Sequence, residues 1–122
     1  MDEVNKLFKK AIDTLNDSEF SFINGRYNIS INRSYYAVFY AARALLLKKG
    51  KNPKTHSGTI SEFGLEYIIN NNFDKNISKI FSELEDDRID SDYDFDFDAT
   101  KTIAKTDLER AEKFIEECKK FL

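Results

Sequence analysis

The chain has 122 residues, enough for one domain with a single hydrophobic core, and 41% of them are hydrophobic. With 34% charged residues and one cysteine, this composition excludes a membrane-embedded protein, an intrinsically disordered chain and a disulfide-stabilised secreted domain. The first residues lack the basic and apolar segments of a secretory signal, so we expect a cytoplasmic location and no association with membranes.

The net charge of −3 is unevenly distributed along the chain. Residues 85–98 hold eight acids and one base, a local charge of −7, so the remaining 18 bases and 14 acids give +4. Four lysines form a basic corner beside His56, which could bind phosphates or be an ordinary solvated surface. They are Lys48, Lys49, Lys51 and Lys54.

Apolar residues at helical spacing predict a first helix from about residue 4 to residue 22, before Gly25. A second helix is predicted from Tyr27 to Lys49, where Gly50 supplies a left-handed cap. After a loop, the pattern predicts a short third helix, a fourth helix with a narrow apolar stripe, and a last helix over residues 101–121. These elements predict an all-α, up-and-down helical bundle of about five helices, forming one domain over residues 1–122.

The segment 94–98 alternates aspartate and phenylalanine, and we interpret it as an extended loop because a lone five-residue strand has no pairing partner. Phe95 and Phe97 are expected to pin this loop to the helices. The aspartate spacing also resembles a calcium loop, but Ala99 stands where glycine is needed and Lys105 where a bidentate glutamate is needed. We therefore expect no metal site and no cofactor.

The second helix is apolar nearly all round, yet it contains two arginines. At 100° per residue, four residues form one ridge along the helix, with side chains that are apolar along their length and polar at their ends. A stripe of smaller residues lies on the opposite side. Such a ridge suits a subunit interface or a cleft; the alternative is a set of core aromatics with arginines that extend to solvent. The ridge is Arg33, Tyr36, Tyr40 and Arg43, and the opposite stripe is Ser34, Val38, Ala41 and Leu45.

A further unusual arginine is in the fourth helix. One i+4 step beyond Leu84, the apolar stripe reaches Arg88, so an arginine occupies the place of the next core residue. A structural interpretation is also open: Arg88 and Asp92 could form an intrahelical ion pair, with Tyr93 only covering the end of the bundle.

Two segments carry a family resemblance: Arg-Ser-Tyr-Tyr-Ala-Val-Phe-Tyr-Ala-Ala-Arg-Ala-Leu-Leu at 33–46 and Arg-Ile-Asp-Ser-Asp-Tyr at 88–93. Together with Thr-His-Ser-Gly at 55–58, they resemble the HEPN superfamily (higher eukaryotes and prokaryotes nucleotide-binding). The resemblance implies a helical bundle that dimerises, with a site where the two subunits meet. Many members are metal-independent ribonucleases, often toxins encoded beside a minimal nucleotidyltransferase antitoxin, and others are non-catalytic binding modules.

The ribonuclease signature of that family is an arginine, four to six residues, and a histidine. Here Arg88 is followed by four residues and then Tyr93. With an ordinary pKa of ~10, tyrosine is a poor base at neutral pH, at a cost of roughly 4 kcal/mol. An arginine at this position can hold a phosphate and offset charge that develops on the phosphorane.

The resemblance thus implies a toxin-like homodimeric endoribonuclease, with Arg88 and Tyr93 as the catalytic pair and Arg33 and His56 as RNA-binding residues. A nucleotidyltransferase partner could attach AMP to the Tyr93 phenol. The alternative is a non-catalytic HEPN interaction module. Cys118 is expected to be a small buried hydrophobe without a chemical role.

Overall fold

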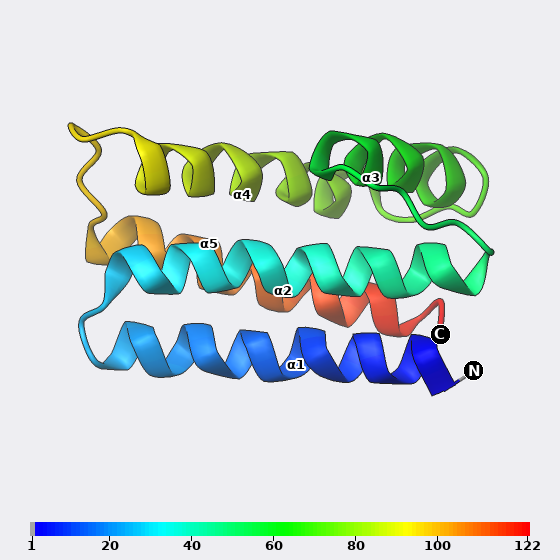
Figure 1. Cartoon of the computed structure of the whole chain (residues 1–122), viewed down its shortest axis with the longest axis horizontal. Coiled ribbons are helices and arrows are strands. Elements are labelled where there is room, and N and C mark those ends of the chain that lie inside the picture. Colours follow the sequence, from blue (N-terminus) through cyan, green and yellow to red (C-terminus); the bar gives the residue numbers. More distant parts are fainter. Residues whose placement is uncertain (1) are drawn as a thin grey trace.

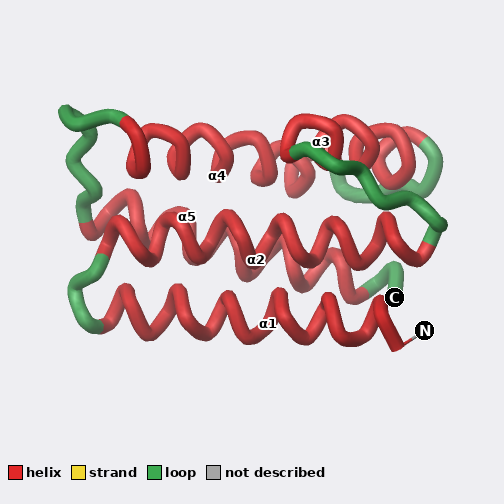
Figure 2. Tube along the Cα trace, viewed as in Figure 1, coloured by secondary structure: helices red, strands yellow, loops and turns green. Residues whose placement is uncertain are grey.

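The computed structural model describes residues 2–122, which form helices and connecting loops (Figure 2). The helices are α1 (Asp2–Ile23), α2 (Tyr27–Lys48), α3 (His56–Phe63), the π-helix η1 (Gly64–Ile69), α4 (Lys75–Tyr93) and α5 (Lys101–Lys119). The all-α bundle is confirmed: α1, α2, α4 and α5 run alternately in opposite directions, and both termini lie at the same end (Figure 1). Within residues 2–122, every helix is too short or too polar to cross a membrane.

The central helix is α2, which packs against α1, α3, α4 and α5. Twelve of its 22 residues are buried, which explains its nearly continuous apolar sequence. Every residue of the small-residue stripe is buried, whereas all four members of the α2 ridge, Arg33, Tyr36, Tyr40 and Arg43, are half-buried. The ridge therefore is a partly open side of the central helix.

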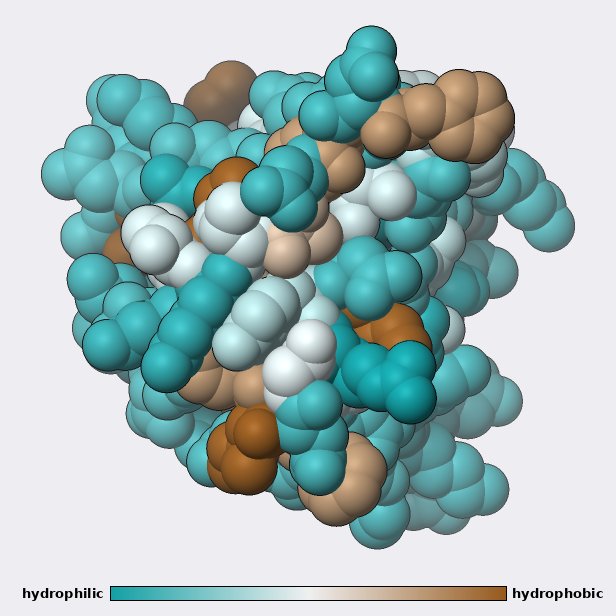
Figure 3. All heavy atoms as spheres, turned by 90° about the vertical axis from the view of Figure 1, so that its left-hand side faces the viewer, coloured by the Kyte–Doolittle hydropathy of each residue, from teal (hydrophilic) through white to brown (hydrophobic). Residues whose placement is uncertain are grey.

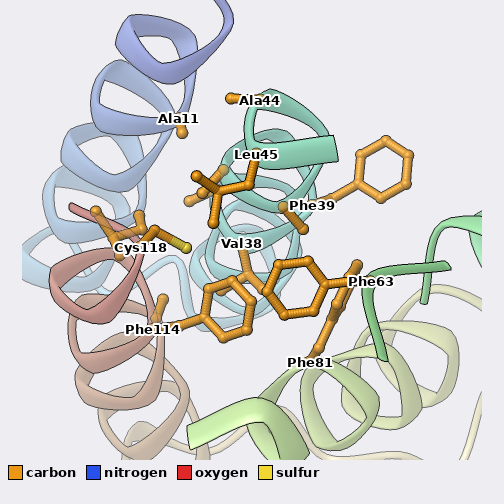
Figure 4. Packing of buried hydrophobic residues seen from close by; sticks show 14 of the residues in the cluster. Ala11, Val38, Phe39, Ala44, Leu45, Phe63, Phe81, Phe114 and Cys118 are labelled. Atoms are coloured by element: carbon orange, nitrogen blue, oxygen red, sulfur yellow. The ribbon is translucent and has the colours of Figure 1, made fainter. Parts of the chain in front are cut away.

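Aromatic side chains fill the core between α2, α3, α4 and α5. Figure 4 shows Phe63, Phe81 and Phe114 converging beneath Val38 of α2. The ring centre of Phe114 lies 5.4 Å from that of Phe63 and 5.8 Å from that of Phe81. Cys118 is completely buried in the same core, as predicted, and burial raises the pKa of its thiol. A thiol held neutral in this way is chemically inert.

The predicted third helix is an α-helix followed by a π-helix. The Oγ1 of Thr55 accepts a hydrogen bond from the Gly58 N–H at 2.9 Å and so caps the start of α3. From Gly64 the turns widen, and Tyr67 becomes buried with its hydroxyl donating to the carbonyl of Leu45. Apolar spacing alone could not distinguish this π-helix from an α-helix, because residues four apart, such as Phe63 and Tyr67, share a face in both.

The segment 94–98 is a loop, as predicted, but the expected role of Phe95 is wrong. Phe95 is fully exposed, and Phe97 is half-buried. A tight turn explains the difference: the Asp94 side chain accepts from the Asp96 N–H at 2.9 Å, and its carbonyl accepts from the Phe97 N–H at 3.1 Å. The ring at the tip of this turn, between these bonds, is left in solvent.

Candidate functional site

Arg88 lies where the apolar stripe of α4 predicted the next core residue. The stripe of buried α4 residues ends at this arginine, whose side chain is 9% exposed. Its guanidinium carbon lies 4.9 Å from the ring centre of Tyr35 and 5.8 Å from that of Tyr36. Aromatic rings stabilise a cation at these distances while covering its apolar stem. Two neighbouring rings of α2 therefore hold the arginine.

The carboxylates beside Arg88 bind it loosely. Nη1 lies 3.5 Å from Asp92 and Nη2 lies 3.6 Å from Glu85, both longer than a tight charge-assisted hydrogen bond. The Nε atom is buried without a partner among residues 2–122. Burial lowers the pKa of Arg88, but Tyr36, Glu85 and the other neighbours raise it above the ordinary value, so the guanidinium stays charged. The intrahelical pair of the structural interpretation is thus present, in a weak form.

Arg33 approaches the same place from the start of α2. Its Nε and Nη2 donate to the Asn32 side-chain oxygen at 3.0 and 2.7 Å, and Asn32 in turn donates to Asp92 at 3.2 Å. The guanidinium carbon of Arg33 lies 5.2 Å from the ring centre of Tyr36. Two guanidiniums from different helices therefore share one ring, Tyr36.

His56, the single histidine of the chain, joins this cluster from the start of α3. The segment after α2 doubles back along the bundle, so that α3 begins over the middle of α2 (Figure 1). The imidazole stacks on Phe39 with ring centres 4.6 Å apart, and its Nδ1 lies 2.9 Å from the Tyr35 hydroxyl. Its ring centre is 5.8 Å from that of Tyr36. Three of the four predicted site residues, Arg33, His56 and Arg88, therefore meet around Tyr35 and Tyr36.

Tyr93, the fourth predicted site residue, is not part of this cluster. It is the last residue of α4 and is 73% exposed. Tyr93 lies five positions after Arg88, so the two side chains point about 140° apart around the helix. Among residues 2–122, no hydrogen bond or cation–π contact joins it to Arg88. Figure 3 shows the end of the molecule at which α4 finishes, where apolar side chains stand apart among hydrophilic ones.

Sequence reasoning missed Tyr35 and Glu85. Tyr35 is completely buried, and desolvation, together with the neighbouring Glu85, raises the pKa of its hydroxyl. The Oε2 atom of Glu85 is buried without a hydrogen-bond partner among the described residues. The position of Glu85 three residues before Arg88 was a signal, because i, i+3 residues share a helix face.

The cluster offers two cations and one imidazole beside a half-buried face. Such groups can bind a phosphodiester and exchange a proton with a hydroxyl beside it. Within residues 2–122, the histidine, cysteine and carboxylate side chains form no group of three placed to hold a metal ion.

Comparison with known families agrees with this architecture. The model of the HEPN domain matches residues 4–121. The chain belongs to the HEPN family. A relative in Methanocaldococcus jannaschii, named "Putative toxin MJ0142", is 35% identical over 98% of this chain and 82% of its own length. A second protein of that organism, named "Putative toxin MJ0605", is 33% identical over 99% of this chain and 90% of its own length. A UPF0332 protein of Archaeoglobus fulgidus is 35% identical over 98% of this chain and 94% of its own length.

Proposed function

We propose that this HEPN protein is a toxin-like, metal-independent endoribonuclease that acts as a homodimer, with Arg88 binding the scissile phosphate. The observation that carries the proposal is the placement of Arg88, a nearly buried cation held against Tyr35 and Tyr36 beside a second guanidinium, Arg33. The names of the two relatives from Methanocaldococcus jannaschii support the toxin class.

The loose ion pairs of Arg88 leave it free to exchange partners. A phosphodiester oxygen at ordinary charge-assisted distance would be closer to the guanidinium than either Asp92 at 3.5 Å or Glu85 at 3.6 Å. The two carboxylates would then move toward solvent. Beyond His56, a surface hollow lined by Lys51, Lys54 and neighbouring residues offers further positive charge for an RNA backbone.

The half-buried face supports the proposed homodimer. The α2 ridge presents aromatic bodies and charged tips, a composition enriched in protein interfaces. Exposed apolar residues continue around the end of α4, where Ile89 is 40% and Tyr93 is 73% exposed. A two-fold axis at this face would bring two copies of Arg88 to one cleft.

Tyr93 is proposed as a regulatory residue rather than as the base. Its exposure leaves the phenol accessible to a nucleotidyltransferase partner. In that reaction the phenolic oxygen bonds to the α-phosphorus of ATP, pyrophosphate leaves, and the phenolic proton passes to a base of the partner. The added phosphate would repel RNA electrostatically near the end of α4.

The test is incubation of the purified protein with defined RNA in EDTA. We expect cleavage by the wild type and loss of cleavage in Arg88→Lys, which keeps the charge but not the planar fork. Arg110→Lys is a matched control, because Arg110 also has two acidic partners, Glu83 and Asp107, each at 3.4 Å. Equal cleavage by the two variants would contradict the role of Arg88. The alternative function is a non-catalytic interaction module, which is compatible with Tyr93 in place of the signature histidine. RNA binding or partner binding by the wild type without any cleavage would favour this alternative.

A further inference from the structure

His56 is a candidate for the general base that Tyr93 does not supply. His56 lies 21 residues from Tyr35 in sequence, yet its Nδ1 and the Tyr35 hydroxyl are 2.9 Å apart. Its ring is fixed by stacking on Phe39, at 4.6 Å and 27°, and on Tyr35, at 5.7 Å and 16°. An imidazole held by these two neighbouring rings and at Nδ1 has one nitrogen, Nε2, left to act on a ligand.

Glu85 favours one direction for the hydrogen bond at Nδ1. The Tyr35 hydroxyl is buried, and desolvation with the nearby Glu85 carboxylate raises its pKa, so the hydroxyl keeps its proton. Oε2 of Glu85 is a buried acceptor that lacks a partner among residues 2–122. A hydroxyl that points its proton toward Glu85 can accept the Nδ1 proton of His56. The Nε2 atom is then unprotonated and can serve as a base.

His56 also shares its neighbours with the phosphate-binding candidate. Arg88 lies 4.9 Å from the centre of the Tyr35 ring, whose hydroxyl holds His56. Arg88 and His56 each lie 5.8 Å from the centre of Tyr36. The cation and the imidazole are therefore oriented by the same two side chains, whereas Tyr93 is on another side of α4.

We propose that His56 is the general base of this protein, with Tyr35 and Glu85 as positioning residues that hold its Nδ1–H tautomer. The assignment rests on the ribonuclease function proposed above. In the reaction, Nε2 takes the proton of a ribose 2′-hydroxyl, and O2′ forms a bond to phosphorus. The bond from phosphorus to O5′ breaks, giving a 2′,3′-cyclic phosphate, and the leaving oxygen takes a proton from water. The hydroxide so formed takes the proton from Nε2, which restores the base. Arg88 binds the phosphate oxygens, on which charge develops.

The tautomer can be tested without any activity measurement. The chain has one histidine, so ¹⁵N NMR of labelled protein gives a single pair of imidazole nitrogens. At alkaline pH we expect Nδ1 to be protonated and Nε2 to be bare in the wild type. Tyr35→Phe, which keeps the ring that contacts Arg88, should shift the population toward the Nε2–H form. An Nε2–H tautomer in the wild type would overturn the proposal.

Kinetics separate this proposal from the function on which it rests. His56→Asn keeps a donor near the Nδ1 position but removes Nε2, and we expect cleavage to fall roughly 10²- to 10⁴-fold with RNA affinity retained. The acid limb of the pH–rate profile should disappear in His56→Asn and persist in Tyr93→Phe. Undiminished cleavage by His56→Asn would refute the role of His56 and leave the ribonuclease function standing. A wild type that does not cleave RNA would refute the ribonuclease function and this role together.

Discussion

The guanidinium carbon of Arg88 lies 4.9 Å from the ring centre of Tyr35, and this contact ties the last third of α4 to the middle of α2. Because the Arg88 side chain is only 9% exposed, it stabilises the fold in addition to any role in binding phosphate. Removing it leaves the Glu85 carboxylate, already short of one partner, without its cation.

We therefore predict that Arg88→Ala lowers the free energy of unfolding by about 2 kcal/mol, through loss of the cation–π contacts and an unpaired carboxylate. Urea denaturation followed by circular dichroism measures this change. Arg88→Lys should lose less stability, since the charge remains, which makes it the better variant for RNA cleavage assays. An Arg88→Ala protein as stable as the wild type would show that the ring contacts contribute little.

A pair of glycines gives a second prediction, on the segment that orients His56. A Cβ at position 58 would lie 2.7 Å from Oγ1 of Thr55, the atom that caps α3, whereas a Cβ at position 64 meets only Cδ1 of Ile68 at 3.8 Å. Gly58→Ala should therefore destabilise the protein by about 1 kcal/mol through loss of the cap.

Gly64→Ala is the matched control for this substitution. Gly64 has an ordinary helical backbone, so alanine there should be neutral or stabilising by up to about 1 kcal/mol. Thermal unfolding of the two variants should show shifts of opposite or clearly unequal size. Equal shifts would contradict the capping role of Thr55. Gly58→Ala should also broaden the imidazole signals of His56, because its helix start would lose its fixed geometry.

Periodicity predicted the bundle because helix formation and burial of a stripe follow the same 3.6-residue repeat. The same repeat identified the half-buried α2 ridge and the inward direction of Arg88, since both depend only on position along one helix. It could not place His56 on Tyr35, because the path of the segment after α2 is decided by tertiary packing. The prediction that Phe95 packs against the helices was wrong for a similar reason, because a turn held by Asp94 sets the direction of the ring.

The α2 ridge supports a prediction on assembly. Tyr40 is half-buried, and the Nζ of Lys10 lies 4.5 Å from its ring centre. Tyr40→Glu would place a carboxylate beside this ammonium, which a monomer tolerates but an apolar interface does not. We expect light scattering to give a dimer for the wild type and a monomer for Tyr40→Glu. Ile69→Glu, at an exposed apolar site on η1, should remain dimeric. A monomeric wild type at micromolar concentration would remove the composite cleft.

A last prediction concerns a buried carboxyl group away from the site. Asp107 is completely buried on α5, and its Oδ2 has no hydrogen-bond partner within residues 2–122. Burial and the neighbouring carboxylate of Asp87 raise its pKa to about 8, although Arg110, 3.4 Å away, acts in the opposite direction. The folded protein therefore keeps a proton that the unfolded chain releases near pH 4.

Because the native state binds the additional proton, this carboxyl lowers the free energy of unfolding as the pH rises from about 4 to about 8, by up to about 1.4 kcal/mol per pH unit. Asp107→Asn replaces the neutral acid with a neutral amide of almost the same shape. We expect the variant to match the wild type near pH 4 and to be more stable at pH 8, as measured by urea denaturation across this range. The control is Asp13→Asn, at an exposed ion pair with Lys9. Its free energy of unfolding should differ from that of the wild type by the same small amount at every pH between 4 and 8. Parallel curves for wild type and Asp107→Asn would show that Asp107 is ionised in the folded protein, with Arg110 outweighing the effect of burial.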